Sequence, residues 1–219
     1  IYNYINNYMF NLLIIIAGFI TKPGLIFFTG GSNSMPKRLY NDFITTLETK
    51  FDVFKIDYND DYNSKIREIY NKNNNIMLLG HSSGCVTALN SCENNNLVSK
   101  IILLDPVKTP TFKREKDLEY LKKVLILDAE LSYKWKEDFP YVPFIPFFKI
   151  NNNDLSISNK KIRRIMIKNY GHTDLIDNPW RNIMHNLKIS TGNNDRSYDS
   201  IKKYYRKLCK IILIFYDMP

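Results

Sequence analysis

The chain has few cysteines, and this shortage limits what can hold its structure together. Only Cys85, Cys92 and Cys209 occur among 219 residues. Three cysteines fit neither a framework of paired disulfides nor a metal site with regular ligand spacing. We therefore predict reduced thiols in a cytoplasmic protein that has no metal site and needs no cofactor.

Long apolar runs are also scarce. The run "MFNLLIIIAGFI" at 9–20 is too short to span a bilayer comfortably, and no basic residue precedes it. We interpret residues 1–23 as an apolar N-terminal segment that supplies a buried opening strand. Membrane anchoring through residues 9–20 is the alternative interpretation.

Motifs for nucleic-acid binding are absent, although the net charge is +9 from 31 basic and 22 acidic residues. There is no zinc-finger spacing, no recognition motif and no long basic run. The densest basic stretch, "IKKYYRKLCK" at 201–210, is typical of the solvated face of a helix. We predict no nucleic-acid partner, and a membrane surface is the less favoured partner.

Short apolar runs recur along the chain and alternate with stretches suited to helices. Most of these runs are nearly continuous and rich in β-branched residues, as in strands that are covered on both faces. They begin at Gly24, Phe51, Asn75, Lys100, Lys123 and Ile162, and the expected helices between them lie at 36–50, 62–71, 84–93 and 111–122. This alternation predicts a mainly parallel sheet with helices on both faces, and functional groups beyond the carboxyl ends of its strands.

The chain reads as a single domain over 1–219, with one segment that breaks the rhythm. Residues 131–160 contain the stretch "YKWKEDFPYVPFIPFFKINNND", in which prolines and aromatic residues replace the pattern of strand and helix. Large apolar side chains serve both pockets and loop packing. The segment therefore either lines an apolar acyl pocket or packs its own aromatic residues into the core.

The sequence Gly80-His81-Ser82-Ser83-Gly84 matches the pattern GxSxG between an apolar strand and a helix of small residues. Glycines on either side let a strand and a helix meet at a sharp, strained turn with the serine at its tip. We predict that Ser82 is a nucleophile; a simple tight turn is the alternative. Ser83 would supply a backbone N–H to an oxyanion, and His81 would be a packing residue that points away.

A second oxyanion donor is expected in the loop after the first main strand, where the sequence reads "FFTGGSNS". Gly30 and Gly31 would let the backbone approach a substrate closely, and the Gly31 N–H is the predicted donor. An ordinary Gly-Gly turn that leads into a helix is the alternative.

A base and an acid complete the predicted constellation. His172 follows the last strand and can reach back across the strand ends, whereas His185 lies in a probable helix. The acid that orients the base stays open from the residues alone. Asp105 and Asp128 each end a strand, and Glu130 is a further option.

The ordered landmarks "FFTGG", "GHSSG", "LLDPV" and "KNYGHTDLID", within 24–177, resemble α/β hydrolases, and more narrowly chlorophyllases with their bacterial lipase and polyester-hydrolase relatives. The resemblance implies a compact α/β-hydrolase fold with no large cap domain. It also implies Ser82 as nucleophile, Asp105 as acid and His172 as base. Bacterial relatives instead carry the acid after the next strand, where this chain has Ser132.

Two positions depart from the family. Thr29 replaces the usual histidine before the oxyanion glycine, and Ser83 stands where chlorophyllases have arginine. The fold and the reaction class therefore transfer better than the substrate. We predict a serine hydrolase that acts on a small apolar carboxylic ester through an acyl-enzyme. The alternatives are an acyltransferase or thioesterase with the same triad, and a catalytically silent binding protein.

Overall fold

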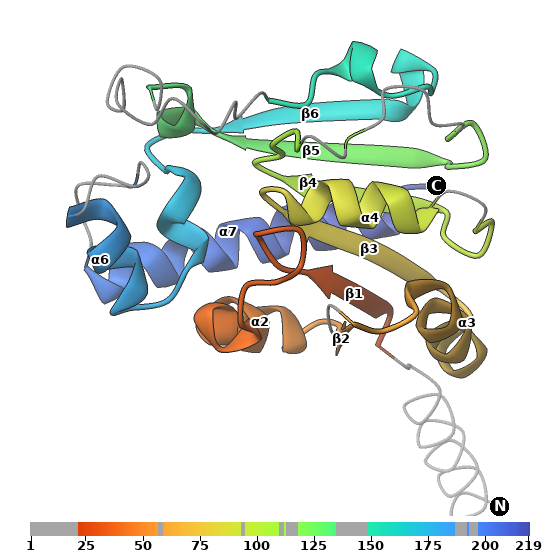
Figure 1. The fold of residues 1–219 in the computed structure, drawn as a ribbon, viewed down its shortest axis with the longest axis horizontal. Coiled ribbons are helices and arrows are strands. Elements are labelled where there is room, and N and C mark those ends of the chain that lie inside the picture. Colours follow the sequence, from red (N-terminus) through yellow and green to blue (C-terminus); the bar gives the residue numbers. More distant parts are fainter. Residues whose placement is uncertain are drawn as a thin grey trace, which may run out of the picture.

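The computed structural model describes residues 22–56, 59–92, 95–109, 112, 118–134, 149–186, 192 and 197–219. Six strands form one sheet in the order β2-β1-β3-β4-β5-β6, and every neighbouring pair is parallel (Figure 1). The strands are β1 (Gly24–Phe28), β2 (Asp52–Lys55), β3 (Ile76–His81), β4 (Lys100–Leu104), β5 (Lys123–Ala129) and β6 (Ile162–Ile167). The predicted parallel sheet is confirmed.

The sequence character of each strand matches its place in the sheet. β1 and β3 are buried at every residue, and β4 and β5 are buried after a half-exposed first lysine. These are the nearly continuous apolar runs expected of strands covered on both faces. The edge strands β2 and β6 carry exposed residues, including the polar side chains at both ends of β2.

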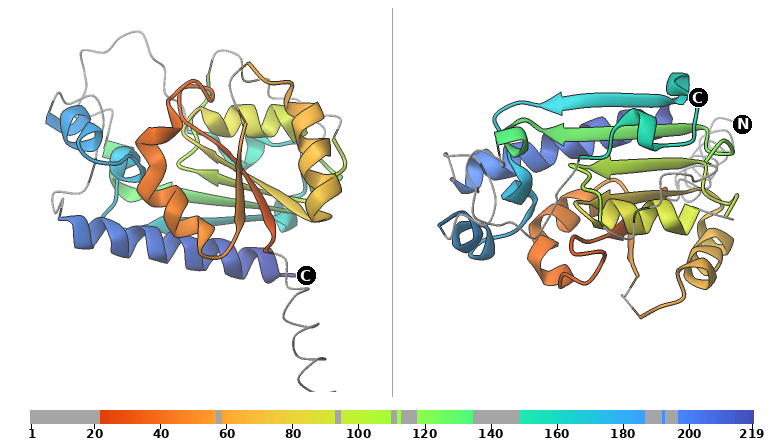
Figure 2. Two further views of the ribbon diagram at one scale, coloured as in Figure 1. Left: turned by 90° about the horizontal axis from the view of Figure 1, so that it is seen from below. Right: turned by 45° about the horizontal axis from the view of Figure 1, so that its top comes forward.

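Helices cover both faces of the sheet (Figure 2). On one face, α2 (Asn41–Glu48), preceded by η1 (Lys37–Tyr40), and the long α7 (Tyr198–Asp217) pack on Leu25 and Phe27. On the other face, α3 (Tyr62–Asn73) and α4 (Gly84–Cys92) pack on Ile26 and Phe28. The two faces alternate along β1 because successive strand side chains point in opposite directions.

Helix α7 confirms the helix expected from the basic C-terminal stretch. Its buried side chains recur every three or four residues, at Ile201, Tyr204, Tyr205, Leu208, Cys209, Ile212 and Phe215. The basic side chains Lys203, Arg206, Lys207 and Lys210 are exposed between them. This stretch is therefore the solvated face of a packed helix. No helix among the described residues is long and apolar enough to cross a bilayer.

Five short elements connect the rest: η2 (Glu130–Lys134), η3 (Asn152–Asp154), η4 (Asn159–Lys161), η5 (His172–Leu175) and α6 (Trp180–Asn186). The helix predicted at 111–122 was wrong for residues 118–122, which form no helix. Leu118 donates to the Ser156 carbonyl, and Lys122 donates to the Ser99 carbonyl. The apolar run at 9–20 and the central part of the aromatic segment, 135–148, lie outside the described residues.

Candidate active site

Ser82 lies in a sharp turn between β3 and α4. Its φ is 56°, in the left-handed region that residues other than glycine rarely adopt. A Cβ added to Gly80 would lie 2.6 Å from Cys85 Cα, and one added to Gly84 would lie 2.1 Å from the Thr29 carbonyl oxygen. Only glycine fits at both positions. The two glycines therefore allow β3, α4 and the end of β1 to pack this closely.

Backbone hydrogen bonds from the end of β4 hold this turn in place. The Ser82 N–H donates to the Leu104 carbonyl over 3.0 Å, and the Ser82 carbonyl accepts from Val107 N–H at 3.3 Å and Cys85 N–H at 3.1 Å. The serine side chain is mostly buried, with 8% of the residue exposed. Its position is therefore fixed by neighbouring strands as well as by its own strained backbone.

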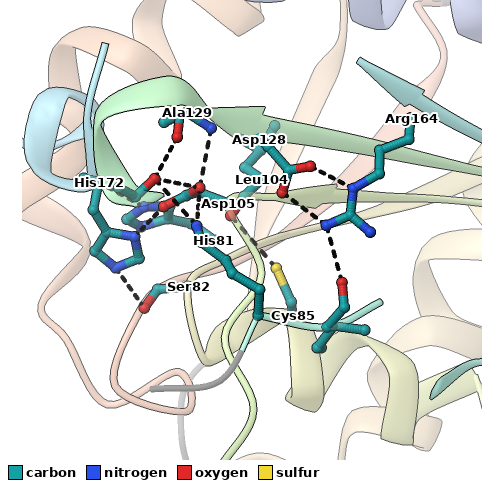
Figure 3. Close-up of polar contacts among 12 residues, drawn as sticks. His81, Ser82, Cys85, Leu104, Asp105, Asp128, Ala129, Arg164 and His172 are labelled. Atoms are coloured by element: carbon teal, nitrogen blue, oxygen red, sulfur yellow. Dashed lines mark hydrogen bonds and ion pairs between the residues drawn. The ribbon is translucent and has the colours of Figure 1, made fainter. Parts of the chain in front are cut away.

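His172 is brought to Ser82 by the turn that follows β6. It opens η5, and its Nε2 lies 2.8 Å from Ser82 Oγ (Figure 3). Its Nδ1 lies 2.5 Å from Asp105 Oδ2. Asp174 steadies the turn, because its Oδ2 accepts the Gly171 N–H at 2.8 Å. His172 is thus within hydrogen-bond reach of both residues that the family resemblance pairs with it.

Asp105 is buried directly after β4 and accepts hydrogen bonds on both oxygens. Oδ2 faces His172, while Oδ1 accepts from Ala129 N–H at 3.0 Å and from Ser132 Oγ at 2.8 Å. The Lys149 ammonium also contacts Oδ1. Burial alone would raise the pKa of Asp105, but Lys149 and His172 outweigh burial and hold that pKa well below its usual range. The carboxyl group is therefore a carboxylate at neutral pH.

The structure does not bring the two alternative acids to His172. Both oxygens of Asp128 bind Arg164, at 2.5 Å from its Nε and 3.0 Å from its Nη2. Glu130 Oε2 accepts the Asn169 N–H at 2.8 Å on the exposed side of the turn. Ser132, at the position where bacterial relatives carry the acid, instead donates to Asp105.

The glycine loop after β1 lies against Ser82. A Cβ added to Gly30 would lie 3.6 Å from Ser82 Cβ and 2.9 Å from Met35 Sδ, so a side chain there would require Met35 to shift. Gly31 has a φ of 61°. Most N–H groups of the loop are bonded within the protein, namely those of Gly30, Ser32, Asn33, Ser34 and Met35.

Two backbone N–H groups beside the serine have no protein acceptor among the residues that the structure describes, those of Gly31 and Ser83. Ser83 is buried, where an N–H without an acceptor is rare. The Ser83 hydroxyl has a separate role that sequence reasoning missed, since its Oγ accepts the Ser32 N–H at 2.7 Å. This bond joins the glycine loop to the residue after Ser82.

The chain forms a six-stranded all-parallel sheet with helices on both faces, the fold class expected from the sequence. Its structure is similar to a ferulic acid esterase from Streptomyces cinnamoneus, with 14% identity over 90% of this chain and 67% of that one and a TM-score of 0.49. It is also similar to an esterase domain from a Rhodothermus marinus protein, with 11% identity over 80% and 90% of the two chains and a TM-score of 0.47.

A predicted CIB-like hydrolase from Thermoplasma acidophilum is a third similar structure, with 15% identity over 78% of this chain and 88% of that one and a TM-score of 0.45. No protein-family model and no curated protein sequence matches the chain.

His81, expected to be a packing residue, forms a buried connection within this site. Its Nδ1 lies 2.9 Å from Tyr40 Oη, and its Nε2 lies 3.1 Å from the His172 carbonyl oxygen. Tyr40 Oη also accepts the Gly30 N–H at 3.1 Å. Burial, with a smaller contribution from His172, lowers the pKa of His81 to about 3, so its ring is neutral at neutral pH.

The partners of His81 fix its tautomer. The His172 carbonyl can only accept a hydrogen bond, so Nε2 of His81 carries the proton. Nδ1 is then an acceptor, and Tyr40 must donate its hydroxyl proton to it. The resulting chain runs from Gly30 through Tyr40 and His81 to the backbone of His172. It connects the glycine loop to the turn that carries the histidine.

The described residues offer no group of three or more His, Cys, Asp or Glu side chains that could hold a metal ion. The polar groups at the site are instead paired with one another. The arrangement places a serine hydroxyl, an imidazole and a carboxylate in series, beside two backbone N–H groups that have no acceptor among the described residues.

Proposed function

We propose that the protein is a serine hydrolase that cleaves a carboxylic ester, with Ser82 as nucleophile, His172 as base and Asp105 as the acid. One observation carries this proposal. His172 bridges Ser82 Oγ at 2.8 Å and Asp105 Oδ2 at 2.5 Å, and the serine sits in a left-handed turn at the start of a helix. A strained serine aligned with an imidazole and a carboxylate is the arrangement that acyl-transfer chemistry requires.

The proposed mechanism begins with the proton of Ser82. Because Asp105 accepts from His172 Nδ1–H, the Nε2 lone pair faces the serine hydroxyl and removes its proton as Oγ attacks the ester carbon. The imidazolium then gives this proton to the departing alkoxide, which leaves an acyl group on Ser82. Water, deprotonated by the same Nε2, attacks the acyl carbon and releases the acid.

The oxyanion that forms in both halves of the reaction needs fixed hydrogen-bond donors. We assign this role to the N–H groups of Gly31 and Ser83. The support is that both lack a protein acceptor among the described residues, while the neighbouring loop N–H groups are paired. Fixed backbone donors of this kind typically contribute a factor of about 100 or more to the rate.

A small apolar ester is the substrate class that we propose. The sequence of 135–148 is rich in phenylalanine and proline, and a residue on each side of it contacts Asp105, Ser132 shortly before it and Lys149 directly after it. The described residues that flank the segment therefore lie beside the site. The landmarks shared with chlorophyllases and bacterial lipases favour ester cleavage over other acyl chemistry.

Turnover of p-nitrophenyl esters from acetate to dodecanoate tests the proposal. We expect Ser82→Ala to lose roughly a thousandfold or more in kcat, because the nucleophile is gone. Ser64→Ala is the matched control, since Ser64 is exposed on α3. Equal turnover by wild type and Ser82→Ala would overturn the role of Ser82, and no turnover by folded wild type would favour the silent binding protein. An added alcohol or amine acceptor separates hydrolysis from acyl transfer.

A further inference from the structure

The Lys149 ammonium contacts Asp105, the proposed acid, and the proposed mechanism gives this contact no role. Lys149 follows the aromatic segment and forms a short antiparallel bridge with Val107. Its ammonium group contacts Asp105 Oδ1 and lies 3.1 Å from Ser132 Oγ. Ala129 N–H and Ser132 O–H already bind the same carboxylate oxygen. Orientation of Asp105 therefore does not require a buried cation as well.

We propose that Lys149 is a positioning residue that acts through Asp105 to set the pH range of activity. Its positive charge opposes the protonation of His172, so the base stays unprotonated at a lower pH than Asp105 alone would allow. This inference rests on the proposed function. It assigns Lys149 a role in the same site without contact to the substrate.

The Asp105 carboxylate lies between two basic side chains, those of Lys149 and His172. Lys149 lies at Oδ1 and His172 at Oδ2, so a protonated His172 would be the second cation on one anion. The Lys149 side chain is 16% exposed and that of Asp105 is 3% exposed, so water screens their charges poorly. A like charge at this range disfavours the charged form of its neighbour. Without Lys149, Asp105 would stabilise a protonated His172 more strongly.

Other groups around this pair do not supply the same effect. His81 and Cys85 are buried and neutral at neutral pH, because burial lowers the pKa of the first and raises that of the second. Burial also raises the pKa values of Tyr133 and Tyr204, so both phenols are neutral. Among the described residues, charged groups on the packed elements include Asp174 on η5, Glu130 on η2 and the Asp128–Arg164 ion pair between β5 and β6. All of them stay unchanged when Lys149 is replaced.

The pH dependence of kcat/KM in wild type, Lys149→Met, Lys149→Gln and Lys149→Arg tests this inference. We expect the acid-side midpoint to rise by about 1 pH unit in the Met and Gln variants, and to stay near the wild-type value in the Arg variant. Lys161→Met is the control for loss of one cation. It removes the ion pair with Glu119, and Lys161 ends η4 directly before β6, at the opposite end of that strand from His172.

An NMR titration of the His172 ring signal, assigned with His172→Gln, follows the same midpoint without any turnover. An upward shift in folded Lys149→Met by NMR and by kinetics supports the inference. The same midpoint as wild type in folded Lys149→Met and Lys149→Gln would overturn it. Failure of the proposed function looks different, since wild type would then lack turnover at every pH while the NMR midpoint could still move with Lys149.

Discussion

Asp105 and Asp128 stand side by side at the carboxyl ends of neighbouring strands, yet only one meets His172. Leu104 pairs with Leu127 in the register of β4 and β5, so the two aspartates follow at the same level of the sheet. They are 2% and 1% exposed, and each contacts a cation, Lys149 or Arg164. The two residues are therefore alike in residue type, in burial and in having a cationic partner.

The backbone makes the difference. Asp128 is still part of β5, where side chains alternate, and its neighbour Leu127 belongs to the core face that includes α7. Asp128 therefore points to the opposite face, where Arg164 binds both of its oxygens. Asp105 lies one residue beyond β4 with a φ of 45°, and this turn releases it from the alternation and directs Oδ2 to His172.

The largest expected effect comes from removing the charge of Asp105. In Asp105→Asn we expect kcat for an ester to fall by about 1,000- to 10,000-fold, because the amide no longer holds His172 in the tautomer that accepts the serine proton. Steady-state kinetics on the ester that wild type turns over best gives the number. A loss of less than about tenfold would place the acid elsewhere.

The matching change at Asp128 should affect stability instead. Asp128→Asn leaves the Arg164 guanidinium without its anionic partner, and we expect the free energy of unfolding in urea to fall by about 3 kcal/mol. We expect kcat of the folded protein to change little. Replacing Arg164 by Met as well should recover part of the loss, and a large drop in kcat with normal stability would reverse the roles of the two aspartates.

A smaller effect is expected from a variant in which His172 is held less firmly in position. Tyr40→Phe removes the proton donor to His81 and the acceptor of the Gly30 N–H. Since His81 holds the His172 carbonyl, we expect kcat to fall by roughly tenfold with little change in KM.

Tyr205→Phe is the matched control for Tyr40→Phe. Tyr205 is also a buried tyrosine on the same face of the sheet, but its hydroxyl has no hydrogen-bond partner among the described residues. We expect this control to keep wild-type kcat. Equal kcat in the two variants would show that the connection through His81 does not position the site.

The smallest expected effect concerns Asp177, a third buried carboxylate. Asp177 accepts the Asp42 N–H at 3.0 Å, and burial raises its pKa to about 6 from 3.8. The folded state therefore holds this proton more tightly than the unfolded state, and stability falls as pH rises from about 4 to about 6. In Asp177→Asn we expect that decline to shrink, with a gain on the order of 1 kcal/mol at pH 7, measured by urea unfolding across pH. An unchanged pH slope would contradict this.

The sequence was sufficient for the sheet and for the sharp turn at Ser82, because both depend on local patterns. Continuous apolar runs mark covered strands, and the glycines at 80 and 84 mark a turn that no larger residue fits. The choice between Asp105 and Asp128 depends on one backbone dihedral beyond a strand end, so the residues alone left it open and only the family resemblance favoured Asp105. The bonds of His81 to Tyr40 and of Lys149 to Asp105 join residues 41 and 44 positions apart, so only the folded chain reveals them.

Labelling with a fluorophosphonate tests the central claim that Ser82 is activated by His172 and Asp105. Intact mass before and after treatment would be followed in wild type, Ser82→Ala, Asp105→Asn and Asp128→Asn, with peptide mapping of the modified residue. We predict one adduct on Ser82 in wild type and Asp128→Asn, none in Ser82→Ala, and labelling at least about 100-fold slower in Asp105→Asn. Fast labelling of Asp105→Asn, or no adduct on folded wild type, would contradict the account.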